Sequence, residues 1–171
     1  MKHMNPVDLK LYLVTDSGYY DEKRFLDMVE KACRGGVTLL QLREKNRGGR
    51  EYLRLAQAVK EITDPAGVPL IIDDRVDVAL ACGAAGVHVG QTDLPVWAAR
   101  QLMGPDKIVG ATAKTVPQAL EAYEQGADYL GVGAAFVTGT KTDAKPISRD
   151  RHLKGYRQGG AHRRGGHRRP G

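Results

Sequence analysis

The sequence has little of what marks several protein classes. It has two cysteines in 171 residues, Cys33 and Cys82, without CxxC spacing, which excludes a disulfide scaffold and a zinc-ribbon type of site. No apolar run reaches eighteen residues, and residues 1–8 lack the apolar segment of a signal peptide. We therefore expect two reduced thiols, no membrane span and a cytoplasmic protein.

Positive charge is concentrated at one end of the chain. Residues 149–171 hold eight Lys or Arg and one Asp, a net charge of +7, so the formal +6 of the whole chain leaves residues 1–148 at −1. The pI near 9.4 is therefore no evidence that the body binds nucleic acid. We expect a folded domain over residues 1–148 and a disordered, basic Arg/Gly/His-rich tail over residues 149–171.

The body alternates between short apolar runs and segments in which apolar residues recur at helical spacing. We expect strands at residues 9–15, 38–42, 68–72, 86–89, 108–111 and 129–132, and helices at residues 24–34, 51–62, 76–82, 95–103 and 117–124. Six such units, less the last helix, predict a parallel sheet.

We interpret the pattern as α/β, of the (β/α)8 TIM-barrel type. A doubly wound sheet is the alternative, but it usually carries GxGxxG after its first strand, where this chain has Asp16-Ser17-Gly18. A closed barrel needs about 200 residues or more, whereas the pattern stops near Thr138. We therefore expect an incomplete barrel that lacks strands seven and eight, with open strand edges that weaken it unless another chain covers them.

Charged residues follow three of the expected strands. They occur in Gln41-Leu42-Arg43-Glu44-Lys45, in Asp73-Asp74-Arg75 and in Gly90-Gln91-Thr92-Asp93. Two carboxylates can hold a hard cation such as Mg²⁺, and Arg and Lys neutralise the phosphate oxygens that the cation also binds. The spacing predicts an enzyme that acts on a phosphorylated substrate.

Structural roles for the same residues stay open at this stage. Asp74 and Asp93 each precede a helical segment and could cap it. Arg43 and Glu44 could form a surface ion pair, and His88, between two valines, could be a buried structural residue.

The motifs together resemble the thiamine phosphate synthase family over residues 9–148. They are Leu11-Tyr12-Leu13-Val14-Thr15-Asp16, Gln41 to Lys45, Asp73-Asp74-Arg75-Val76-Asp77, Gly86 to Pro95, Asp128 to Gly133 and Thr138-Gly139-Thr140-Lys141. The resemblance implies a transferase of alkyl or aryl groups in thiamine biosynthesis. It would join 4-amino-2-methyl-5-hydroxymethylpyrimidine diphosphate to 4-methyl-5-(2-phosphoethyl)thiazole with Mg²⁺, giving thiamine phosphate and pyrophosphate.

The resemblance also implies residue roles. Asp74 and Asp93 resemble the magnesium ligands, and Arg43, Lys45 and Lys141 resemble the catalytic groups that stabilise the leaving pyrophosphate. The substrate-binding positions implied are Gln41, Arg43, Lys45, Asp73, Thr112, Thr138, Thr140 and Lys141.

Three departures qualify the implied function. Asp73 stands where the family commonly has Asn, Lys114 stands where it has His, and the two last strands with their phosphate-binding turn are not recognisable. We interpret the basic end as a truncated or out-of-frame terminus, which leaves the turnover of this chain open.

The alternatives are a non-catalytic barrel remnant whose tail binds RNA or an acidic surface, and a thiazole tautomerase-like barrel. The expected partners are the two small-molecule substrates; self-association is left open, and neither a membrane nor nucleic acid is expected.

Overall fold

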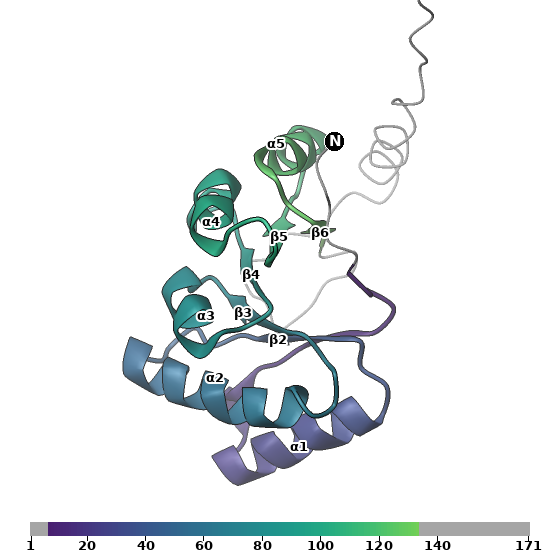
Figure 1. Ribbon diagram of the computed structural model, residues 1–171, viewed down its shortest axis with the longest axis vertical. Coiled ribbons are helices and arrows are strands. Elements are labelled where there is room, and N and C mark those ends of the chain that lie inside the picture. The colour runs from purple at the N-terminus through teal and green to yellow at the C-terminus, as the bar shows by residue number, and fades with distance from the viewer. Residues whose placement is uncertain (1–6, 134–171) are drawn as a thin grey trace, which may run out of the picture.

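The computed structural model describes residues 7–133, which form a curled parallel sheet with helices on its outer side (Figure 1). The strands are β1 (Tyr12–Val14), β2 (Leu39–Leu42), β3 (Leu70–Asp73), β4 (Gly86–Val89), β5 (Ile108–Thr112) and β6 (Tyr129–Gly131). The helices are α1 (Glu22–Arg34), α2 (Gly49–Thr63), α3 (Val76–Cys82), α4 (Val96–Met103) and α5 (Val116–Gln125), with a 3₁₀ turn, η1 (Ser17–Tyr19).

The strands lie in the sheet in the order of the chain, from β1 to β6. Each neighbouring pair is parallel, with registers such as Val14 opposite Gln41 and Asp73 opposite His88. A doubly wound sheet would reverse its strand order part-way, so the sequential order confirms the TIM-barrel type. The described residues thus supply six consecutive strands of such a barrel. The expected loss of strands seven and eight concerns residues outside the described range.

Local signals set most element ends. Asp21 caps α1 by accepting a hydrogen bond from the Arg24 backbone, and Thr115 caps α5 by accepting one from the Gln118 backbone. Gly126 ends α5 at a φ of 105°, a left-handed conformation that suits glycine. Strand β1 is shorter than the expected residues 9–15, and η1 was not anticipated. It forms because the Asp16 carboxylate accepts a hydrogen bond from the Gly18 backbone.

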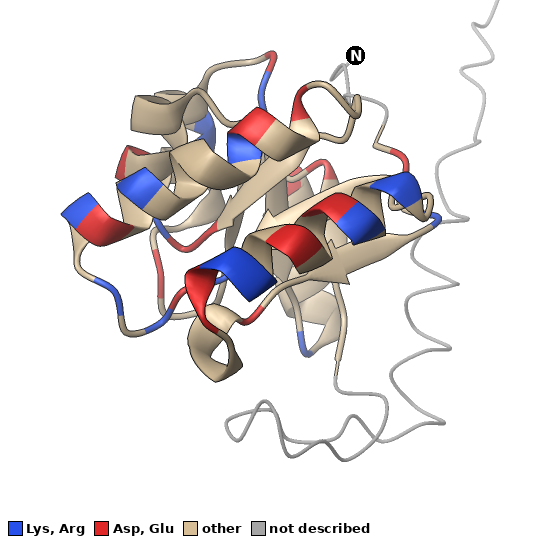
Figure 2. Cartoon of the chain, turned by 90° about the horizontal axis from the view of Figure 1, so that it is seen from below, with Lys and Arg blue, Asp and Glu red and all other residues tan. Residues whose placement is uncertain are grey.

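The main core lies between the sheet and the helices. Every residue of β2, β3 and β4 is buried, which is typical of strands covered on both faces. Leu40, Leu42, Ile72 and Val87 belong to one cluster with helix residues such as Leu55. Charged residues lie mostly along the helices and in the loops, and the strands are almost free of them (Figure 2). No helix in the described part of the chain has the length and apolar character to cross a membrane.

Candidate active site

The carboxyl ends of β2, β3 and β4 bring the expected charged residues together. The Lys45 ammonium lies 3.1 Å from Asp73 Oδ2 and also contacts the Asp74 carboxylate. The Arg43 guanidinium lies 3.7 Å from the same Asp73 oxygen. Residues that are about thirty positions apart in the chain therefore form one charged cluster, as parallel strands ending at a common edge require.

Asp74 and Asp93 adjoin one another in this cluster. Each carboxyl group alters the pKa of the other, and Asp93 Oδ2 accepts a hydrogen bond from the Gly90 backbone at 2.8 Å. Asp74 has a φ of 62°, and among residues 7–133 it is the one non-glycine residue with positive φ. Aspartate tolerates this conformation better than most residues, and such backbone strain clusters at functional sites.

The three carboxyl groups titrate differently because their surroundings differ. Burial, followed by the charge of Asp74, raises the pKa of Asp73 to about 6 against the pull of Lys45 and Arg43. Burial and the hydrogen bond with Asp74 also raise the pKa of Asp93. Burial acts in the same direction on Asp74, but hydrogen bonds from Lys45 and Asp93 outweigh it and lower the pKa of Asp74. Asp74 is therefore the member of the cluster held most firmly as a carboxylate.

This donor set fits Mg²⁺. Two carboxyl groups close enough to share a proton can share a dication instead. Within residues 7–133 no three His, Cys, Asp or Glu side chains are grouped as a complete metal cage. Magnesium does not need one, because it commonly binds one or two carboxylates and takes its other ligands from substrate phosphates and water.

The structural roles left open by the sequence do not apply to these residues. The N-caps of α3 and α4 are Arg75 and Pro95, and neither helix has a side-chain cap hydrogen bond. Asp74 and Asp93 are thus not helix caps. Arg43 approaches Asp73, whereas Glu44 pairs with Arg47, so the surface pair Arg43–Glu44 does not form.

A second polar group crosses the inner face of the sheet. The Gln41 amide donates to the Tyr12 hydroxyl at 2.5 Å, and the Tyr12 and Tyr129 hydroxyls lie 2.6 Å apart. His88 contacts the Tyr129 hydroxyl through Nδ1 at 3.1 Å and the Thr112 hydroxyl through Nε2 at 2.9 Å. The chain of contacts links five strands, β1, β2, β4, β5 and β6. It places the expected substrate residues Gln41 and Thr112 in one network.

Sequence reasoning missed the two tyrosines of this network. Tyr12 and Tyr129 lie next to apolar residues in their strands, and alternation alone does not reveal which face of the sheet is polar. A usable signal was Gly110. A Cβ atom there would lie 2.1 Å from the Tyr129 ring, so the glycine is required by the tyrosine that passes over it. His88 is 8% exposed, in agreement with the buried alternative.

Not every expected site residue can be placed. Thr138, Thr140 and Lys141 lie outside the described residues. Lys114, the departure from the usual histidine, is exposed beyond the end of β5, where its backbone donates to the Gln118 side chain. The described half of the site is therefore the part formed by β2, β3 and β4 and by the inner face.

Comparison with known proteins identifies the family of the chain. The model of the thiamine monophosphate synthase family matches residues 11–157. The chain belongs to this family. Its function in the close relatives is thiamine-phosphate synthesis, which agrees with the resemblance, the expected enzyme class and the barrel-type fold.

Three relatives show the extent of the match. The chain is 58% identical to thiamine-phosphate synthase 2 of Streptococcus pneumoniae over 145 residues, covering 85% of this chain and 69% of that protein. It is 52% identical to thiamine-phosphate synthase of Ruminiclostridium cellulolyticum over 152 residues, covering 89% of this chain and 72% of that protein. The solved thiamine phosphate pyrophosphorylase of Pyrococcus furiosus superimposes with a TM-score of 0.74 at 39% identity, covering 88% of this chain and 68% of that structure.

Proposed function

We propose that this chain binds the pyrimidine diphosphate and the thiazole phosphate and condenses them to thiamine phosphate with release of pyrophosphate. The observation that carries the proposal is the adjoining pair Asp74 and Asp93 beside Lys45 and Arg43. Such a site suits a diphosphate chelated to a cation, because carboxylates hold the cation and basic groups hold the phosphate oxygens.

The proposed reaction breaks the bond between the pyrimidine methylene carbon and the diphosphate oxygen, and it forms a bond from that carbon to the thiazole nitrogen. The electron pair of the broken bond leaves on pyrophosphate. Asp74 and Asp93 would hold Mg²⁺, which when bound neutralises charge on the diphosphate. Lys45 would turn from Asp73 and Asp74 to the leaving oxygens, and Arg43 would supply a second positive charge there.

The pyrimidine contact is assigned to Gln41. Its side chain is buried on the inner face, and its amide is oriented by the hydrogen bond to Tyr12. Thr112 is a second candidate contact, since its hydroxyl faces the same network through His88. Roles for Thr138, Thr140 and Lys141 rest on the family resemblance alone. Whether the chain associates with copies of itself can be tested by light scattering.

The decisive experiment measures thiamine phosphate formation and pyrophosphate release from the two substrates, with and without Mg²⁺. Asp93→Ala is compared with the matched control Asp77→Asn, which removes an exposed carboxylate three residues from Asp74. We expect Mg²⁺-dependent product from the parent chain and from Asp77→Asn, and a loss of about a hundredfold or more for Asp93→Ala. Equal rates for both variants would contradict the proposed metal site.

If the parent chain forms no product, binding of Mg²⁺-pyrophosphate separates two cases. Retained binding would mean that the diphosphate half of the site is present without turnover. Loss of both would contradict the proposed function. Salt-sensitive RNA binding that disappears on deletion of residues 149–171 would instead favour the basic-tail alternative.

A further inference from the structure

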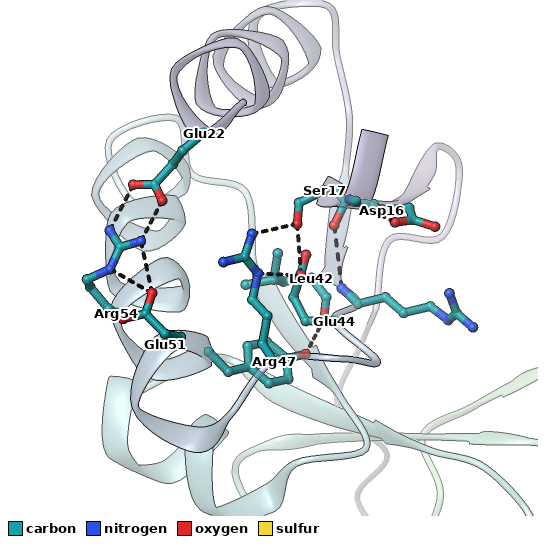
Figure 3. A network of polar contacts seen from close by, with 12 residues as sticks. Asp16, Ser17, Glu22, Leu42, Glu44, Arg47, Glu51 and Arg54 are labelled. Carbon is teal, nitrogen blue, oxygen red and sulfur yellow. Dashed lines mark hydrogen bonds and ion pairs between the residues drawn. The ribbon is translucent and has the colours of Figure 1, made fainter. Parts of the chain in front are cut away.

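Three side chains tie two loops together beside the charged cluster (Figure 3). Ser17 Oγ donates to Glu44 Oε2 at 2.8 Å, and Arg47 Nε donates to the same oxygen at 2.7 Å. Arg47 Nη2 also donates to Ser17 Oγ at 3.2 Å, which closes the triangle. We call Ser17, Glu44 and Arg47 the Glu44 clamp. It joins the segment after β1 to residues 43–48, the β2–α2 loop.

The clamp acts on the loop that carries both basic groups of the site. Arg43 and Lys45, which flank Glu44 in the chain, both approach Asp73. Glu44 between them instead contacts Ser17 and Arg47 (Figure 3). Because Arg43, Glu44 and Lys45 are consecutive in the chain, holding the Glu44 side chain restrains the backbone from which both neighbours project.

Burial makes this anchor firm. The Glu44 side chain is 6% exposed and Ser17 is 3% exposed, so the charged and polar contacts are shielded from water. Both hydrogen bonds fall on Oε2, while Oε1 is buried and has no hydrogen-bond partner among the described residues. A buried acid with a vacant oxygen is unfavourable for stability by itself.

We infer that the Glu44 clamp is a positioning device that holds the β2–α2 loop so that Arg43 and Lys45 meet a bound diphosphate. The inference rests on the proposed function. With the backbone anchored at Glu44, only the Lys45 side chain must turn from Asp73 and Asp74 to the phosphate. Less conformational freedom is then lost on binding, and the positive charges are already near their final place.

The test uses Arg47→Ala and a matched control, Arg54→Ala. Arg54 also joins the first two helical segments, since it pairs with Glu22 of α1 and Glu51 of α2, but it forms a separate group from the clamp (Figure 3). Urea unfolding first establishes that each variant is folded. Calorimetry then gives the Kd for inorganic pyrophosphate in the presence of Mg²⁺. We expect Arg47→Ala to weaken binding by about tenfold and Arg54→Ala by less than about twofold.

A merely structural role is distinguished by coupling to Lys45. If the clamp works through the basic pair, Arg47→Ala will weaken binding much less in a Lys45→Ala background than in the parent chain, because the placed group is already gone. Strict additivity of the two changes would overturn the inference. Should Arg47→Ala fail to fold, Ser17→Ala removes both contacts of the Ser17 hydroxyl but keeps the Arg47–Glu44 pair, and it is expected to weaken binding by about threefold.

The outcomes separate the two proposals. A parent chain that binds Mg²⁺-pyrophosphate, with unchanged affinity in Arg47→Ala and Ser17→Ala, would overturn the clamp and leave the proposed function standing. A parent chain that does not bind it would overturn the proposed function, and the clamp would then have no diphosphate to serve.

Discussion

The two ends of the sheet contain the same kinds of charged residue, but the contacts of those residues differ. At the amino ends of β5 and β6, Arg100 of α4 donates to the carbonyl oxygens of Gly104, Lys107 and Gly126 and to the Asp128 carboxylate. These contacts use all five of its N–H groups. At the carboxyl ends, Lys45 contacts the carboxylates of Asp73 and Asp74, Asp93 adds a third carboxyl group, and Asp74 has a strained backbone.

The difference indicates which end serves stability and which end awaits a ligand. Asp128 Oδ2 accepts hydrogen bonds from Arg100 and from the Val109 backbone, so that buried network is satisfied within the protein. The carboxyl end has raised pKa values at Asp73 and Asp93, which a bound cation would lower. Barrel enzymes place chemistry at the carboxyl ends of their strands and stability at the other end, and our proposed site agrees with that division.

The largest expected effect is on stability at the amino end. Arg100→Ala leaves the Asp128 carboxylate buried without its ion partner and frees three carbonyl groups, so we expect the free energy of unfolding to fall by about 3–5 kcal/mol. Urea unfolding checks this value, with the exposed Lys31→Ala on α1 as the control. A loss below about 1 kcal/mol would mean that the Arg100 network does not stabilise the fold.

Next comes a loss of activity at the carboxyl end with little loss of stability. Lys45→Ala removes a half-exposed ammonium that faces the carboxylates and, in our proposal, the leaving pyrophosphate. We expect the rate of pyrophosphate release to fall by about 10²–10³-fold, as for removal of one transition-state donor. The melting temperature should change little. A variant that loses stability as Arg100→Ala does would break the comparison between the two ends.

A smaller effect follows from the raised pKa of Asp73. Because the folded-state pKa is about 6 and the ordinary value is 3.8, this group favours folding at low pH, and that contribution disappears as the pH rises through about 6. Asp73→Asn should therefore be more stable than the parent at pH 7 without Mg²⁺, by about 3 kcal/mol. Between pH 4 and 6 the free energy of unfolding should also fall less for Asp73→Asn than for the parent chain.

Urea unfolding at several pH values measures this effect. Asp77→Asn is the control, because the hydrogen bond from Arg75 lowers the pKa of Asp77 and gives the opposite sign. An Asp73→Asn variant that is less stable at pH 7 would show that the contact with Lys45 outweighs the cost of burial.

The smallest expected effect concerns the inner face. Tyr12→Phe removes the hydroxyl that joins Gln41 to Tyr129, and we expect a loss of about 1 kcal/mol in the free energy of unfolding. Tyr20→Phe, at an exposed tyrosine, provides the control. If Tyr12→Phe also loses affinity for the pyrimidine substrate, without further loss of stability, this would support the assignment of Gln41 as the pyrimidine contact.

The sequence alone determined the order and type of the elements, because these depend on signals within a few residues of each other. Apolar periodicity located all six described strands and five helices, among them α5, whose ends are set by Thr115 and Gly126. The resemblance also identified the family. Fine boundaries, such as the shorter β1, depended on pairing with β2, which periodicity does not encode.

Only the tertiary structure decided which polar residues act together. In the sequence, Asp74 and Asp93 have the same position before a helix as a capping residue. In the structure they do not cap a helix, because they lie at the edge that β3 and β4 share. Glu44 contacts Ser17 from 27 positions away, and Tyr12 meets Tyr129 across 117. Such contacts are fixed by strand order and by the curling of the sheet. These arise from the burial of apolar faces on the helices, so the polar residues themselves carry no local record of their partners.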